Sequence, residues 1–182
     1  MKKLIIIFLA TVLFFGCSKN DETPTAAADQ LPPATQTGAN KVGCLVNGQV
    51  LLPYQKNPFG PPAVVCFYQF VNNQFHFSLG FSNDKISNGL RNINIASINI
   101  ELQQGQTYQL KLDNGNSAFA SYVDFAISAG YYTNNINTGE LKITKLDQTN
   151  AIISGTFWFN AVRTNGAIAE IKEGRFDMQY SQ

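Results

Sequence analysis

The sequence predicts an all-β protein, with an antiparallel β-sandwich as the favoured architecture. Apolar and polar residues alternate with a period of two through most of the chain after residue 41, which is typical of strands that bury one face. Turn residues separate these runs often enough for about ten short strands. No segment keeps the apolar spacing of a long amphipathic helix. A partly closed, lipocalin-like β-barrel is the alternative, because alternation does not show whether a sheet closes.

Two hairpins are predicted in the first part of the domain. The alternating residues 42–46 lead into Asn47-Gly48, a pair that favours the type I′ turn of a two-residue hairpin loop. After a proline-rich stretch, residues 63–71 and 74–81 flank Asn72-Asn73, and asparagine tolerates the positive φ that a tight turn requires. Alternate apolar side chains in both hairpins are expected to face the core.

Further strands are predicted along the rest of the chain from the same alternation. They cover residues 92–95, 108–112, 118–127, 141–146, 153–161, 169–171 and 176–180. Turn residues separate several of them, at 113–116, 147–150 and 165–166. Each strand has one apolar and one polar face, so we expect core on one side of the sheet and solvent on the other.

The N-terminus, residues 1–16, is predicted to be a signal peptide that is removed. Lys2 and Lys3 precede an apolar run over residues 4–15. A membrane-spanning helix needs about 20 apolar residues, whereas a charged start and a short apolar stretch are typical of an export signal. Cys17 closes a segment that resembles a lipobox, so we predict that Cys17 is lipidated. An ordinary secretory signal with a stray cysteine is the alternative.

Lipidation would attach the protein to a membrane without spanning it. Two or more acyl chains on Cys17, each burying about 0.8 kcal/mol per CH₂ group, give stable anchoring. Residues 17–40 are predicted to be the lipidated N-terminus and a flexible tether, because their composition buries little apolar surface. Residues 41–182 have the length of a single all-β domain. The charged residues at 19–22 resemble the signal that exports lipoproteins of Bacteroidota, so we expect an outer-membrane lipoprotein on the periplasmic side or, preferably, the cell surface.

The charge balance excludes one large class of partner. The chain has 13 basic and 12 acidic residues, and removing Lys2 and Lys3 with the signal peptide leaves 11 basic residues and a net charge of about −1. Nucleic acid binding depends on a basic surface that neutralises phosphates, so we expect no nucleic acid partner. The expected partners are the membrane, through the N-terminal lipid, and a protein or glycan ligand.

The remaining cysteines predict a disulfide. Cys44 and Cys66 form an even pair once Cys17 is set aside, and exported proteins commonly oxidise such pairs. Closing a loop of this size would stabilise the fold by about 3 kcal/mol in the chain-entropy model. Two buried free thiols are the alternative. No metal or cofactor is predicted, since His76 is the only histidine and no Cys-x-x-Cys motif occurs.

Four segments carry a family resemblance. They read GCLVNG at 43–48, TGELKITKLD at 138–147, ISGTFWF at 153–159 and GRFDMQY at 174–180. With these segments the chain resembles a family of small lipoproteins of Bacteroidota that is catalogued as a domain of unknown function. The resemblance implies an exported location and a β fold, and it carries no assigned activity or catalytic residue.

No residue pattern predicts catalysis. Residues 82–85 spell Ser-x-x-Lys, but the penicillin-binding enzymes that use this motif need it at the head of a helix and a Lys-Thr-Gly strand as well. His76 lies on the polar face of a predicted strand, where a surface histidine is the ordinary interpretation. We therefore expect no enzyme, and a hydrolase is the least favoured reading.

Outward-facing aromatic residues are the remaining functional signal. Trp158 alternates away from the apolar face of its strand, and Tyr131-Tyr132 must place one ring on each face. Aromatic rings on a sheet surface can stack on a sugar or a peptide. The sequence therefore favours a binding or interaction module. A small-molecule carrier with a cavity inside a β-barrel is the alternative.

Overall fold

The computed structural model describes residues 26–85 and 89–182, which form eleven strands in one sheet. The strands are β1 (Lys41–Val46), β2 (Gln49–Leu51), β3 (Val64–Val71), β4 (Gln74–Asn83), β5 (Arg91–Ile98), β6 (Thr107–Leu110), β7 (Ala118–Asp124), β8 (Ala129–Tyr132), β9 (Gly139–Asp147), β10 (Ile152–Val162) and β11 (Ile168–Gln179). Two short 3₁₀ helices, η1 (Ala27–Gln30) and η2 (Phe125–Ile127), complete the described elements. The predicted all-β class is confirmed.

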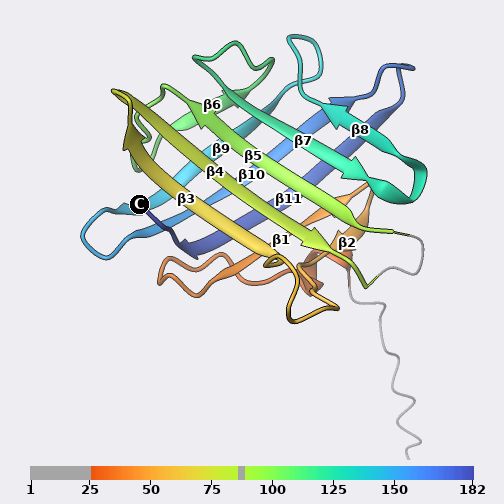
Figure 1. Cartoon of the computed structure of the whole chain (residues 1–182), viewed down its shortest axis with the longest axis horizontal. Coiled ribbons are helices and arrows are strands. Elements are labelled where there is room, and N and C mark those ends of the chain that lie inside the picture. The colour runs from red at the N-terminus through yellow and green to blue at the C-terminus, as the bar shows by residue number, and fades with distance from the viewer. Residues whose placement is uncertain (1–25, 86–88) are drawn as a thin grey trace, which may run out of the picture.

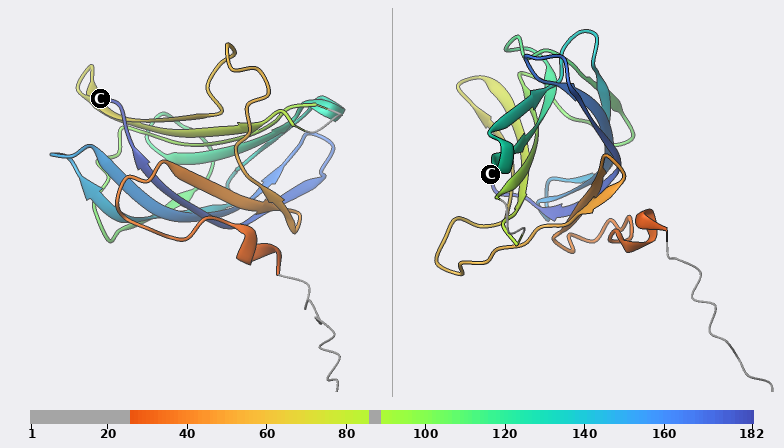
Figure 2. Two further views of the ribbon diagram at one scale, coloured as in Figure 1. Left: turned by 90° about the horizontal axis from the view of Figure 1, so that it is seen from below. Right: turned by 90° about the vertical axis from the view of Figure 1, so that its right-hand side faces the viewer.

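The sheet curls into a partly closed barrel rather than two stacked sheets (Figure 1). Its strand order is β2-β1-β11-β10-β9-β6-β7-β5-β4-β3, with β8 pairing to β10 and β7. Almost all neighbours are antiparallel, and β6 with β7 is the parallel pair. A bridge between Phe67 of β3 and Ser181 links the last strand in this order to the residues just after β11. The partly closed barrel, which was the alternative to the predicted sandwich, is therefore the observed architecture. A single hydrogen-bonded sheet curls round on itself (Figure 2).

Both predicted early hairpins are confirmed. Asn47 and Gly48 have φ values of 49° and 78°, and β1 and β2 pair directly across them. Asn72 and Asn73 have φ values of 51° and 62°, and β3 and β4 pair across that turn over their whole length. Positive φ at both central positions is the signature of the type I′ turn, whose twist matches that of the strands.

Aromatic side chains fill the inside of the barrel. Phe77, Phe81, Phe157, Phe159 and Phe176 are each at most 3% exposed. Their rings lie next to one another, with centroids 6.3–6.5 Å apart in the pairs they form. Burying each such side chain stabilises the fold by about 1.5–3 kcal/mol relative to leaving it in water. The inward faces of facing strands therefore meet in one continuous apolar core.

The predicted disulfide is wrong, because Cys44 and Cys66 are both free and buried. Cys44 lies in β1, which pairs with β2 and β11, whereas Cys66 lies in β3, which pairs with β4. Both side chains pack in the apolar core. Burial raises the pKa of both thiols, that of Cys66 to about 12, so neither forms the thiolate that disulfide exchange requires at neutral pH. The alternative of two buried thiols is the one observed.

The end of the predicted tether is fixed to the barrel. Leu31 is only 6% exposed, and residues 35–39 wrap around the buried carboxylate of Asp177. Asp177 accepts hydrogen bonds from the Thr35 hydroxyl at 2.6 Å and from the backbone N–H of Gly38 at 2.8 Å. Residues 31–40 thus differ from the expected flexible coil. The signal peptide and Cys17 lie outside the described residues.

Candidate binding site

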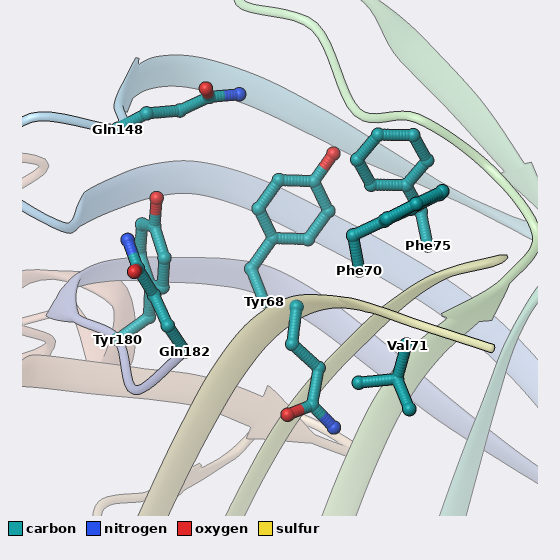
Figure 3. Close-up of a pocket in the computed structure, with 8 residues that line it drawn as sticks. Tyr68, Phe70, Val71, Phe75, Gln148, Tyr180 and Gln182 are labelled. Atoms are coloured by element: carbon teal, nitrogen blue, oxygen red, sulfur yellow. The ribbon is translucent and has the colours of Figure 1, made fainter. Parts of the chain in front are cut away.

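One end of the barrel opens into a cavity of about 460 Å³ (Figure 3). The turn between β3 and β4, the turn between β9 and β10, and the C-terminal residues after β11 surround it. We call this site the aromatic mouth, and it is lined by Tyr68, Gln69, Phe70, Val71, Phe75, Gln148, Tyr180 and Gln182.

Strand alternation places the aromatic rings of the mouth. Phe70 pairs with Phe75, two positions along from the pair formed by Tyr68 and Phe77, so all four side chains point to the inside of the barrel. Phe77 lies in the core, but Phe70 lies at the strand end and is 58% exposed. The same inward face therefore changes from buried core to exposed surface where β3 and β4 reach the end of the barrel.

The rings contact one another in fixed geometries. Tyr68 stacks on Phe75 with centroids 5.8 Å apart and an interplanar angle of 16°. Tyr180 meets Tyr68 edge-on at 5.9 Å, and Phe70 lies 4.7 Å from Phe75. Offset stacking and edge-to-face contacts are the favourable arrangements for aromatic pairs. Tyr68 and Tyr180 are only 4% and 6% exposed, so within this cluster Phe70 and the partly buried Phe75 present their rings to the cavity.

Hydrogen bonds from the backbone hold this surface in place. The Tyr68 hydroxyl accepts a hydrogen bond from the backbone N–H of Leu102 at 2.9 Å. Ser181 exchanges two backbone hydrogen bonds with β3, donating to the carbonyl of Cys66 and accepting from the N–H of Tyr68, each at 3.0 Å. These bonds fasten the C-terminus to β3, which sets Tyr180 and Gln182 beside the cavity.

The side chains that line the mouth are uncharged. Its eight lining residues are aromatic, aliphatic or amide side chains. Burial raises the pKa of both Tyr68 and Tyr180, so each keeps its hydroxyl proton at physiological pH. Gln69, Gln148 and Gln182 can each donate and accept hydrogen bonds through their amides. The site can therefore offer stacking and neutral hydrogen bonds to a ligand.

Trp158 faces outward, as predicted, and lines a second cavity on the outer wall of the barrel. It is 41% exposed, and its Nε1 donates a hydrogen bond to Glu140 Oε2 at 3.2 Å. The groove, of about 570 Å³, also contains Lys142, Lys172 and Arg175. Unlike the mouth, this groove combines aromatic residues, Phe157 and Trp158, with several charged side chains.

A family model described as a domain of unknown function (DUF6252) matches residues 70–178 of the chain. The chain belongs to this family. The match begins at Phe70 and spans β4 to β11, so it includes most of the barrel but stops before Tyr180. No curated protein and no solved structure matches the chain.

Tyr131 and Tyr132 of this DUF6252 protein point to opposite faces of β8, as predicted. Tyr131 is buried, with its ring 5.6 Å from that of Tyr122 and the Arg163 guanidinium 5.9 Å away. Tyr132 is 59% exposed. Neither tyrosine lines the mouth or the Trp158 groove, so the structure does not bring the three predicted binding residues together.

The remaining motif residues of the DUF6252 chain lie in strand and loop surroundings. Ser82 belongs to β4 and Lys85 follows it, so the Ser-x-x-Lys run has no helix to turn lysine towards serine. Within residues 26–85 and 89–182, no three acidic, histidine or cysteine side chains gather as metal ligands. The same residues include no helix long and apolar enough to cross a membrane.

Sequence reasoning missed the mouth because its rings follow the same alternation as the core. Phe75 shares the apolar face of Phe77, and nothing in that pattern separates a lining residue from a buried one. One signal was available, since Phe70 and Phe75 flank Asn72-Asn73 symmetrically. Large aromatic side chains that point inward next to a hairpin turn lie where the strands end. At that end of the barrel no further layer of side chains covers them.

Proposed function

We propose that this DUF6252 protein is a non-enzymatic binding module that is anchored in the outer membrane through a lipid on Cys17. Its ligand binds at the aromatic mouth. The observation that carries this proposal is the cluster of Tyr68, Phe70, Phe75 and Tyr180 around an open cavity. Phe70 is the exposed ring of this cluster and the other three support it from below, and aromatic side chains at such positions are among those that most often dominate binding energy.

The chemistry of the mouth favours an uncharged saccharide. A sugar ring has an apolar C–H face that stacks on aromatic rings, and hydroxyls at its rim that match the amides of Gln148 and Gln182. An anionic ligand would lose its hydration without gaining an opposite charge, since all eight lining side chains are uncharged. A neutral oligosaccharide satisfies both conditions.

Binding at the mouth is favoured over carriage inside the barrel. The inward positions that a carrier would leave open are occupied by phenylalanines that are at most 3% exposed, including Phe77, Phe159 and Phe176. A lipocalin-like carrier instead encloses a ligand cavity. Binding is also favoured over hydrolysis, because glycosidases place two side-chain carboxyl groups across the sugar and no aspartate or glutamate lines the mouth.

The ligand class is tested on an array of neutral and acidic glycans probed with residues 17–182. We expect signals from neutral oligosaccharides, and we expect those signals to weaken at least tenfold with Phe70→Ala. Phe70 is 58% exposed, so its removal should leave the fold intact. Binding confined to acidic glycans would contradict the proposal.

The anchor is tested separately by labelling cells with radioactive palmitate. Label should enter the wild-type protein and be absent from Cys17→Ala. A Cys17→Ala protein that still takes up the label would overturn the proposed attachment.

A further inference from the structure

The loop between β2 and β3 exposes one aromatic side chain almost completely. Phe59 is 97% exposed, more than any other large apolar side chain that the structure describes. Pro58 precedes it, and Gly60, Pro61 and Pro62 follow. An apolar side chain exposed to water is unfavourable, and burying the ring of Phe59 in an apolar environment would be favourable. We call residues 54–62 the Phe59 finger.

Hydrogen bonds give the Phe59 finger a fixed shape. The Asn57 side chain accepts a hydrogen bond from the Phe59 N–H at 3.0 Å, and the Asn57 carbonyl accepts one from the Gly60 N–H at 3.0 Å. At its base, the Lys56 N–H donates to Asp84 Oδ1 at 2.6 Å. The three prolines add fixed φ angles. The exposure of Phe59 is therefore built into the loop, and does not come from a loose chain.

The finger and the start of the described chain leave the same side of the barrel. In Figure 1 and in Figure 2, right, the loop between β2 and β3 and the helix η1 both lie on the lower side, and Figure 2, left, which views this side, shows them at its opposite edges. The loop between β8 and β9 leaves the opposite, upper side in both views. Ala26 comes nine positions after Cys17, a length of chain that reaches about 30 Å when fully extended. A lipid on Cys17 would thus hold this side close to the membrane.

We propose that the Phe59 finger inserts into the membrane interface beneath the anchored barrel. Phe59 enters the headgroup region, and Lys56 at its base faces the phosphates, as basic and aromatic residues do in interfacial segments. Lys85, whose ammonium lies 5.4 Å from the centre of the Tyr54 ring, adds a second positive charge at the base. The finger is thus a second membrane contact, and this inference rests on the proposed anchoring.

Chemical coupling separates this inference from native lipidation. Residues 17–182 are coupled through Cys17 to maleimide lipids in phosphatidylcholine vesicles that contain phosphatidylglycerol. Cys44 and Cys66 are buried, so coupling falls on Cys17. Palmitate labelling reports on lipidation in cells, while the coupled protein reports on the finger even if that labelling fails.

Tryptophan fluorescence then measures insertion. F59W/W158F places the only tryptophan on the finger, and I136W/W158F places it on Ile136, which is 88% exposed, in the loop on the opposite side. We expect F59W/W158F to shift its emission to the blue and to be quenched by brominated acyl chains, with I136W/W158F unaffected. Equal quenching at both positions, or none at position 59, would overturn the inference.

Discussion

The ring of Phe157 packs directly over Gly174, its cross-strand partner between β10 and β11. A Cβ atom at Gly174 would overlap that ring. Phe176 lies in the same way over Gly155, two positions along the same strand pair. The two glycines let large rings lie flat against the sheet, which is how the barrel accommodates so many phenylalanines.

Gly174→Ala should therefore destabilise the fold. Overpacking a filled core costs about 1–3 kcal/mol, and the ring of Phe157 cannot move away because it is 3% exposed. Gly80→Ala is the matched control, since a Cβ there would meet its nearest neighbour at 3.7 Å. Urea unfolding of both variants measures the difference. Equal stability of the two variants would contradict this reading of the core.

Asp177→Asn should loosen the N-terminal segment. Asp177 is 1% exposed and accepts hydrogen bonds from Thr35, Gly38 and Ser154. Replacing a charged acceptor by an amide should cost about 1–3 kcal/mol. Limited proteolysis should then cut residues 31–40 faster than in the wild type, whereas Asp29→Asn, on the exposed η1, should change nothing.

Acid should remove the stabilisation that the ionised Asp177 carboxylate gives to the wild-type protein. Burial alone would raise the pKa of Asp177, but the hydrogen bonds from Thr35, Thr37, Ser154 and Gly38 outweigh it and hold the pKa well below its usual range. The stabilisation is therefore complete above the unfolded pKa of about 3.9 and is lost as pH falls towards the lower folded value. Between about pH 5 and pH 2, the unfolding free energy should therefore fall less steeply in Asp177→Asn than in the wild type. Parallel pH profiles of unfolding free energy for the two proteins would contradict the stabilising role of the hydrogen bonds to Asp177.

Both buried thiols should be free in protein isolated from cells. Alkylation without reductant should leave Cys44 and Cys66 unmodified in the folded protein, because burial raises their pKa, and should modify both after unfolding. Mass spectrometry counts the labelled residues. If the two thiols of the unfolded protein reacted only after reduction, a disulfide between Cys44 and Cys66 would be present and this prediction would be contradicted.

Local features of the fold could be predicted from sequence, and long-range ones could not. The turns at Asn47-Gly48 and Asn72-Asn73 follow from residues that accept positive φ, so their hairpins were predictable. Closure depends on the bridge between Phe67 and Ser181, and no pattern links positions so far apart. An even number of cysteines suggested a disulfide but gave no information on which strands would be neighbours.

The candidate site divides in the same way. The outward direction of Trp158 followed from alternation, whereas the mouth depends on where β3 and β4 end relative to the closed barrel. The docking of residues 31–40 was equally hidden, because their composition is that of a tether and their partner Asp177 lies in the last strand. The composition of residues 31–40 predicts a flexible segment, but it gives no information about the distant carboxylate that this segment surrounds.

Calorimetric titration of one neutral oligosaccharide into three proteins tests the central claim most directly. The proteins are the wild type, Phe70→Ala at the mouth and Trp158→Ala in the outer groove. If the ligand binds at the aromatic mouth, Phe70→Ala should bind the oligosaccharide at least tenfold more weakly than the wild type. Trp158→Ala should bind it as tightly as the wild type. Loss of binding in Trp158→Ala with full affinity in Phe70→Ala would place the ligand in the outer groove and contradict the proposed site.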